Sequence, residues 1–140
     1  MVNPKKKGNR GENNFFKWLR NNNVDKSAMR NPSSGAGYYK SDVINSIGYN
    51  FEVKTVKKLG LQQAWKQSER DAEKSQAIPS VVIHFDGMPE DMWLIVIDNY
   101  TWADMFKKAQ EPKSKEPDRQ MRYDLQALKN AATRVMKYLK

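Results

Sequence analysis

The stretch that decides the fold is Asp-Val-Ile-Asn-Ser-Ile-Gly-Tyr-Asn-Phe-Glu-Val-Lys-Thr-Val, at residues 42–56. Apolar residues recur along it with the alternation of β-structure, and a glycine stands near its middle. The stretch therefore predicts two strands, residues 42–47 and 49–56, joined near Gly48.

Glu52 and Lys54 share one face of the second predicted strand, because successive side chains of a strand point to opposite faces. Val53 then points into the core. The preceding strand can bring Asp42 to the same place, and two carboxylates make a hard oxygen site suited to Mg²⁺. A metal there can lower the pKa of a water and neutralise charge on a phosphate, while an ammonium stabilises the transition state. The alternative is a surface Glu–Lys pair on an amphipathic strand.

Glu12 offers a third carboxylate. It precedes Phe15 and Phe16 by three and four positions, so it lies on the apolar side of a helix expected to begin near Asn9. A carboxylate on that side is costly unless it is paired or binds a metal. The alternative is a capping box, in which Asn9 is the N-cap and Glu12 follows three residues later.

Gln63 and Gln67 stand four residues apart on a further predicted helix, so they share a face. An amide there could bind a phosphate or a water at the acidic site, and the alternative is a solvated side chain.

The whole pattern predicts an α/β fold with a mixed central sheet flanked by helices and an added C-terminal helix. The expected elements are a helix from Asn9 to Asn21, a strand at 28–31, the two strands above, a helix over 61–74, strands at 80–85 and 92–98, a helix from Thr101 to Ala109 and a helix from about Asp118.

The length of 140 residues suits one core with appendages. We expect a flexible basic arm at 1–8, a main domain at 9–110, and a linker with an amphipathic helix at 111–140. That helix has a heptad-like seam, which predicts either packing on the main domain or a dimer contact. The seam consists of Met121, Leu125, Leu128, Ala132, Val135 and Leu139.

The net charge of +9 makes a polyanion the first partner to consider, and the basic residues concentrate towards both ends of the chain. With no cysteine, disulfides and thiolate zinc sites are excluded, and a single histidine argues against sites built on several imidazoles. No apolar run approaches the length of a membrane span or a signal peptide. We expect a soluble, cytoplasmic protein. The basic residues Lys5, Lys6, Lys7 and Arg10 would bind phosphates, or alternatively only solubilise the arm.

Four segments, in this order and spacing, resemble the PD-(D/E)xK nuclease superfamily, and within it the archaeal and phage type of Holliday junction resolvase. The similar segments are Lys7-Gly8-Asn9-Arg10-Gly11-Glu12, Arg30-Asn31-Pro32-Ser33-Ser34-Gly35, Ser41-Asp42-Val43-Ile44 and Phe51-Glu52-Val53-Lys54-Thr55. The resemblance implies a restriction-endonuclease-like core in a nuclease domain at 9–110.

The resemblance also implies roles for individual residues. Asp42 and Glu52 would bind Mg²⁺, for which Mn²⁺ would substitute, with the Val53 carbonyl completing the shell and Glu12 as a further ligand, direct or through water. Lys54 would be the catalytic lysine, and Gln67, or else Gln63, would assist. Ser34, with Ser33 as the alternative, would contact the scissile phosphate, and Arg30 the backbone near the cut. Tyr38 and Tyr39 would stack on unpaired bases or be half-buried loop aromatics, and Lys40 and Lys57 would extend the DNA surface.

The implied activity is Mg²⁺-dependent cleavage of branched DNA, chiefly four-way junctions, by in-line attack of a water. A C₂ homodimer is the simplest assembly that makes two matched cuts. The alternatives are a nicking or restriction-like enzyme acting on duplex DNA, an RNA-directed nuclease, and a non-catalytic DNA-binding module of the same fold. The small size and high asparagine content suggest a phage-encoded protein acting in a bacterial host.

Overall fold

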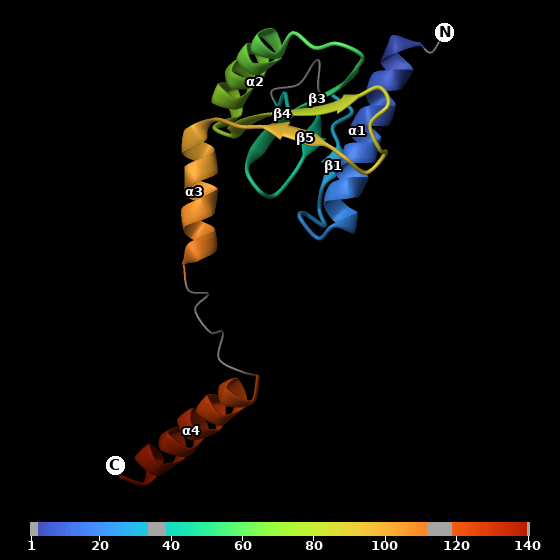
Figure 1. Cartoon of the computed structure of the whole chain (residues 1–140). Helices are drawn as coiled ribbons and strands as arrows, with labels where there is room; N and C mark the ends of the chain where they lie inside the picture. The colour runs from blue at the N-terminus through green and yellow to red at the C-terminus, as the bar shows by residue number, and fades with distance from the viewer. Residues whose placement is uncertain (1–2, 34–38, 112–118, 140) are drawn as a thin grey trace. The chain divides into compact units, whose positions relative to one another are not determined.

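The computed structural model describes residues 3–33, 39–111 and 119–139 (Figure 1). The chain divides into two compact units, Met1–Ala103 and Asp104–Lys140, and the division falls within the third helix. The elements are α1 (Pro4–Asn21), β1 (Met29–Arg30), β2 (Val43–Ile44), β3 (Tyr49–Val56), α2 (Leu61–Ser75), β4 (Ile78–Phe85), β5 (Leu94–Val96), α3 (Asn99–Gln110) and α4 (Arg119–Tyr138). The predicted α/β class is confirmed.

The helix α1 begins well before Asn9, so the predicted start is wrong, and residues 4–8 of the predicted arm are helical. Asn3 is the N-cap, and its side chain accepts a hydrogen bond from the Lys5 backbone N–H at 3.0 Å. Pro4 follows at the first helical position, where a missing N–H costs nothing and φ is already set. This start outcompetes Asn9, and it places the lysine run in the first turns of the helix.

The sheet of the first unit is mixed, as predicted. β3 pairs with β4 in parallel over its whole length, from Tyr49 against Ile78 to Val56 against Phe85, and β5 joins β4 antiparallel. The short strands β1 and β2 form a separate antiparallel pair. The parallel pairing requires a crossover, and α2 provides it.

Two helices cover opposite faces of β3 and β4. Phe15 and Leu19 of α1 pack on Phe51, Val53 and Val82. Residues of the other parity face α2, where Ala64 packs on Val81 and Ile83. Because Glu52 and Lys54 share parity with this second set, they belong to the α2 face of the sheet.

Three predicted strands are shorter in the structure, and β1 keeps only Met29–Arg30 of the predicted 28–31. β2 ends at Ile44 because the Asn45 amide donates to Tyr49 O at 2.7 Å and accepts from Tyr49 N at 3.2 Å, which closes the connection with a side chain. At the far end of β5, Asp98 accepts from the Thr101 backbone N–H at 2.8 Å. Asp98 therefore caps α3, and the prediction that Thr101 would do so is wrong.

The second unit contains α4, which confirms the predicted C-terminal helix. The apolar seam residues are largely exposed, with Leu128 at 67% and Val135 at 57%. None of the helices in the described residues combines the length and apolarity needed to cross a membrane.

Candidate active site

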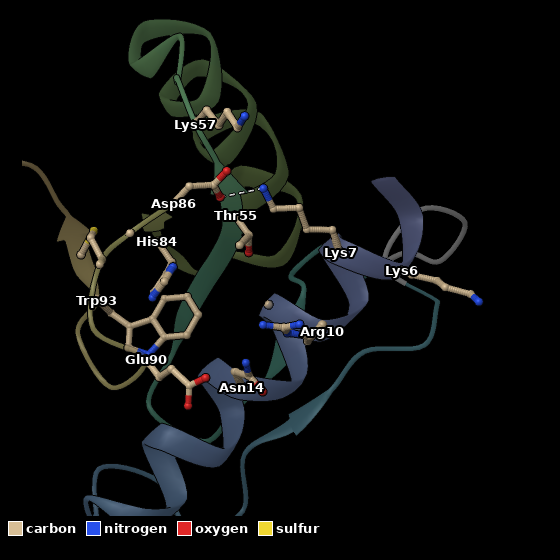
Figure 2. Close-up of a pocket in the computed structure, with 13 residues that line it drawn as sticks. Lys6, Lys7, Arg10, Asn14, Thr55, Lys57, His84, Asp86, Glu90 and Trp93 are labelled. Atoms are coloured by element: carbon tan, nitrogen blue, oxygen red, sulfur yellow. Dashed lines mark hydrogen bonds and ion pairs between the residues drawn. The ribbon is translucent and has the colours of Figure 1, made fainter. Parts of the chain in front are cut away.

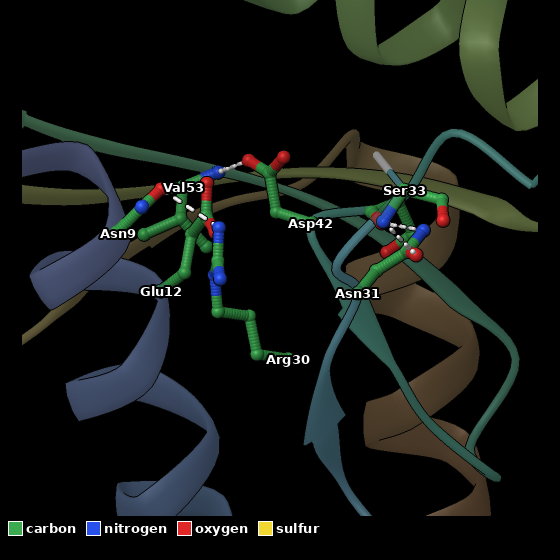
Figure 3. Close-up of polar contacts among 8 residues, drawn as sticks. Asn9, Glu12, Arg30, Asn31, Ser33, Asp42 and Val53 are labelled. Carbon is green, nitrogen blue, oxygen red and sulfur yellow. Dashed lines mark hydrogen bonds and ion pairs between the residues drawn. The ribbon is translucent and has the colours of Figure 1, made fainter. Parts of the chain in front are cut away.

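Asp42 is held by both neighbouring strands. Its backbone N–H donates to Phe51 O at 2.9 Å, and its carbonyl accepts from Asn31 N, also at 2.9 Å. Its carboxylate Oδ2 accepts from the Val53 backbone N–H at 2.8 Å (Figure 3). The carboxylate therefore lies against the peptide that joins Glu52 to Val53, as the two-strand prediction required.

Glu52 and Lys54 form an ion pair on the α2 face, with Lys54 Nζ at 2.5 Å from Glu52 Oε1. The Glu52 side chain is 6% exposed and that of Lys54 is 28% exposed. The predicted sharing of one face is confirmed, and the alternative of a surface pair is wrong because Glu52 is buried. A buried carboxylate needs a partner, and Lys54 supplies it.

Glu12 lies half-buried on α1 and pairs with Arg30 of β1. Glu12 Oε2 stands 2.6 Å from Arg30 Nε, and Arg30 Nη2 donates to Asn9 Oδ1 at 2.7 Å. Figure 3 shows the guanidinium reaching from the β1 side to both helix side chains. The capping-box alternative for Glu12 is thus wrong, and Asn9 accepts from an arginine instead of capping the helix.

The charges of these residues act on Asp42. Burial is the largest cause that raises the pKa of Asp42, followed by the negative charge of Glu52, and the pKa reaches about 7. The Val53 N–H bond and the positive charge of Lys54 lower the pKa, while the Glu12 charge raises it further. The carboxylates of Glu52 and Glu12 are therefore close enough to Asp42 to disfavour its charged form.

Ser41 and Asn31 position Asp42, and neither role was predicted. The Ser41 hydroxyl is buried, accepts from Phe51 N at 2.9 Å and donates to Val43 O at 2.8 Å. The Asn31 amide donates to Ser41 O at 2.8 Å. The residue types carry a signal, since buried serine and asparagine often bond to nearby backbone, but the partners depend on the fold.

Of the other predicted site residues, Ser34 and Tyr38 lie outside the described residues. Ser33 is exposed, and its backbone N–H donates to Asn31 Oδ1 at 3.0 Å. Tyr39 is half-buried, and its carbonyl accepts from the Asn31 amide. Lys40 is half-buried as well.

The two glutamines lie on α2, with Gln67 half-buried and Gln63 exposed. Within the described part of the chain, no hydrogen bond joins either glutamine to Asp42 or Glu52. Their assisting role stays a prediction.

Three of the predicted DNA-binding lysines and Arg10 line a cavity of about 830 Å³ on the other side of α1 (Figure 2). Lys7 pairs there with Asp86 across 2.7 Å. Lys6, Arg10 and Lys57 line the same cavity, whereas Lys5 is exposed on α1 outside it. The cavity itself was not predicted.

The donors available to a metal ion are limited. Over residues 3–33, 39–111 and 119–139, no three carboxylate, imidazole or thiol side chains are arranged to hold one ion together. The negative charge of Glu52 acts directly on Asp42, while Glu12 forms an ion pair with Arg30.

Comparison of the chain with protein-family models, with curated proteins and with solved structures found no match.

Proposed function

We propose that this chain is a Mg²⁺-dependent endonuclease of the PD-(D/E)xK type that cleaves branched DNA. The observation that carries the proposal is the convergence of Asp42, Glu52 and Lys54 beside the Val53 peptide, with the pKa of Asp42 raised to about 7. Titratable groups with a strongly shifted pKa cluster at catalytic sites. The mixed sheet between α1 and α2 is compatible with the restriction-endonuclease-like core that the sequence resemblance implies.

The carboxylates of Asp42, Glu52 and Glu12, called the acidic cluster below, fit a hard divalent cation. Burial and mutual repulsion raise the free energy of the charged state, and a cation removes both penalties. Asp42 and Glu52 would hold Mg²⁺ together with the Val53 carbonyl, and Glu12 would act at longer range. When bound, the ion supplies Lewis-acid chemistry at the phosphate and eases deprotonation of the attacking water.

The protein's own side chains would do the rest. Lys54 has an ammonium group beside the carboxylates, and it would orient the attacking water or neutralise charge on the phosphate in the transition state. Arg30 is anchored through Glu12 and Asn9, so its side chain is preorganised beside the cluster for a backbone phosphate.

The preference for branched DNA rests on the sequence resemblance, and the charge of +9 supports a polyanionic substrate. A homodimer follows from the need for two matched cuts in a nearly two-fold symmetric junction. The exposed seam of α4 offers a surface for it.

The test is cleavage of a synthetic four-way junction beside a linear duplex of the same sequence, each with Mg²⁺, with Mn²⁺ and with EDTA. We expect metal-dependent cutting of the junction that Asp42→Asn and Lys54→Ala abolish, while Lys26→Ala, an exposed lysine away from the cluster, cuts normally. Equal rates on junction and duplex would support the duplex nuclease instead. Binding of junctions with no cutting in either metal would favour the non-catalytic module.

A further inference from the structure

The cavity on the far side of α1 lies apart from the acidic cluster. Its walls are the first turns of α1, the end of β3 and the connection from β4 to β5. Arg10 precedes Glu12 by two residues, so the two side chains leave α1 on nearly opposite sides. Thr55 follows Lys54 on β3, so it points to the opposite face of the sheet. Nothing in the proposed chemistry uses this cavity.

One part of the cavity is cationic and contains the guanidinium of Arg10. Arg10 extends from α1 towards His84 and Trp93, as Figure 2 shows. Within the described residues Arg10 makes no ion pair, whereas Lys7 is already paired with Asp86. Lys57, directly after β3, adds a second cation to the lining, and its charge acts on Asp86. A planar guanidinium with its donors free is suited to a phosphate group.

The opposite wall is aromatic and has unused donors. Trp93 and His84 lie with ring centroids 5.1 Å apart, and both line the cavity. Trp93 Nε1 and Thr55 Oγ1 are buried without a hydrogen-bond partner among the described residues. Buried donors are nearly always satisfied, so these two call for an acceptor that the described residues do not provide. Glu90, also on the lining, offers an acceptor for an amino group.

The cavity combines cationic groups for a phosphate, an aromatic wall for a base and polar groups for the edge of that base. This combination matches a nucleotide, and the cavity volume of about 830 Å³ leaves room for one. We propose that this cavity binds one unpaired nucleotide of the DNA substrate, with its phosphate on Arg10 and Lys57 and its base against Trp93 and His84. A base inside a continuous duplex enters only after unstacking, which costs a few kcal/mol, whereas a base at a branch or bulge is already free.

The position of the cavity suits a substrate that also reaches the acidic cluster. Lys57 follows Lys54 by three residues, a distance of about 10 Å along an extended strand. A DNA strand crossing the end of β3 would therefore contact both faces. This inference rests on the proposed nuclease function for its choice of DNA, and it supplies a physical source for selectivity towards branched substrates.

The experiment measures binding in EDTA, so that it does not depend on cleavage. The probe is a duplex with one central unpaired 2-aminopurine, compared with the same duplex in which that base is paired. We expect tighter binding of the bulged duplex by fluorescence anisotropy, together with quenching of 2-aminopurine as it meets the aromatic wall. Arg10→Gln should reduce the preference for the bulge about tenfold. Thr55→Val, which keeps the shape and removes the hydroxyl, should reduce it as well.

The matched control is Lys26→Gln, which removes the same charge from an exposed residue outside the cavity. If Arg10→Gln and Lys26→Gln weaken both duplexes equally, Arg10 serves only general attraction and the proposal is overturned. Equal affinity of the wild type for both duplexes also overturns it, and quenching by a free deoxynucleotide alone would reassign the cavity to mononucleotides. A preference for the bulge without any Mg²⁺-dependent cutting would leave this site standing while the nuclease proposal falls.

Discussion

Replacing Asp42 with asparagine should stabilise the metal-free protein at pH 8. Asp42 has a pKa of about 7 in the folded chain against an ordinary value of 3.8, so folding binds a proton between these values. The contribution of Asp42 to stability therefore falls as pH rises from 3.8 to 7 and is constant above that. A rise of about three units corresponds to about 4 kcal/mol, of which roughly 2–3 kcal/mol is lost between pH 5 and pH 7.

Asparagine is a suitable replacement because its Oδ1 can still accept from the Val53 N–H. It has no charge to repel Glu52, so the pH-dependent penalty disappears. Urea unfolding in EDTA at pH 5, 6, 7 and 8 measures the effect. All four tryptophans lie in the unit Met1–Ala103, so their fluorescence reports the unfolding of the unit that contains the site.

The difference in unfolding free energy between Asp42→Asn and the wild type should widen with pH and level off above 7. Mg²⁺ at pH 8 should stabilise the wild type more than the variant, because the ion then relieves the repulsion. Parallel stability curves for the two proteins from pH 5 to 8 would refute both the raised pKa and the crowding of charge from which it follows.

Three further substitutions test the scaffold. Glu12→Gln should cost about 1–2 kcal/mol by weakening the bond to Arg30, and should lower the pKa of Asp42 because one repelling charge is gone, as a carboxyl NMR titration would measure. Ser41→Ala should cost about 1–3 kcal/mol in urea unfolding, since it leaves the Phe51 N–H without its acceptor. Gly11→Ala should cost about 1–3 kcal/mol, because the new Cβ would lie 2.0 Å from Thr55 Oγ1, and the double variant with Thr55→Ala should recover much of the loss.

The sequence predicted correctly those features that depend on a single strand. The bounds of β3 and the shared face of Glu52 and Lys54 follow from alternation alone, and the structure confirms both. The start of α1 was missed because Asn3-Pro4 and Asn9 both satisfy local capping rules, and only the structure shows which one the helix uses.

The electrostatics and the cavity could not be predicted, because both depend on segments far apart in the chain. The pKa of Asp42 depends on carboxylates from α1 and β3 meeting at one place, and no spacing in the sequence gives that distance. The cavity forms where α1 meets the connection after β4. Arg30 was expected on DNA, and its bond to Glu12 could not be foreseen from either residue alone.

The Val53 residue links the interior of the protein to the direction of the Asp42 carboxylate. This residue is 8% exposed and packs in the cluster that contains Phe15, while its N–H donates to Asp42 Oδ2. The peptide group is planar, so a displacement of Val53 on the core side tilts the N–H that holds the carboxylate. An apolar substitution at Phe15 would thus shift Val53 and change the direction of the Asp42 carboxylate. The change would come from the opposite face of the sheet and would leave the charges of the acidic cluster unaltered.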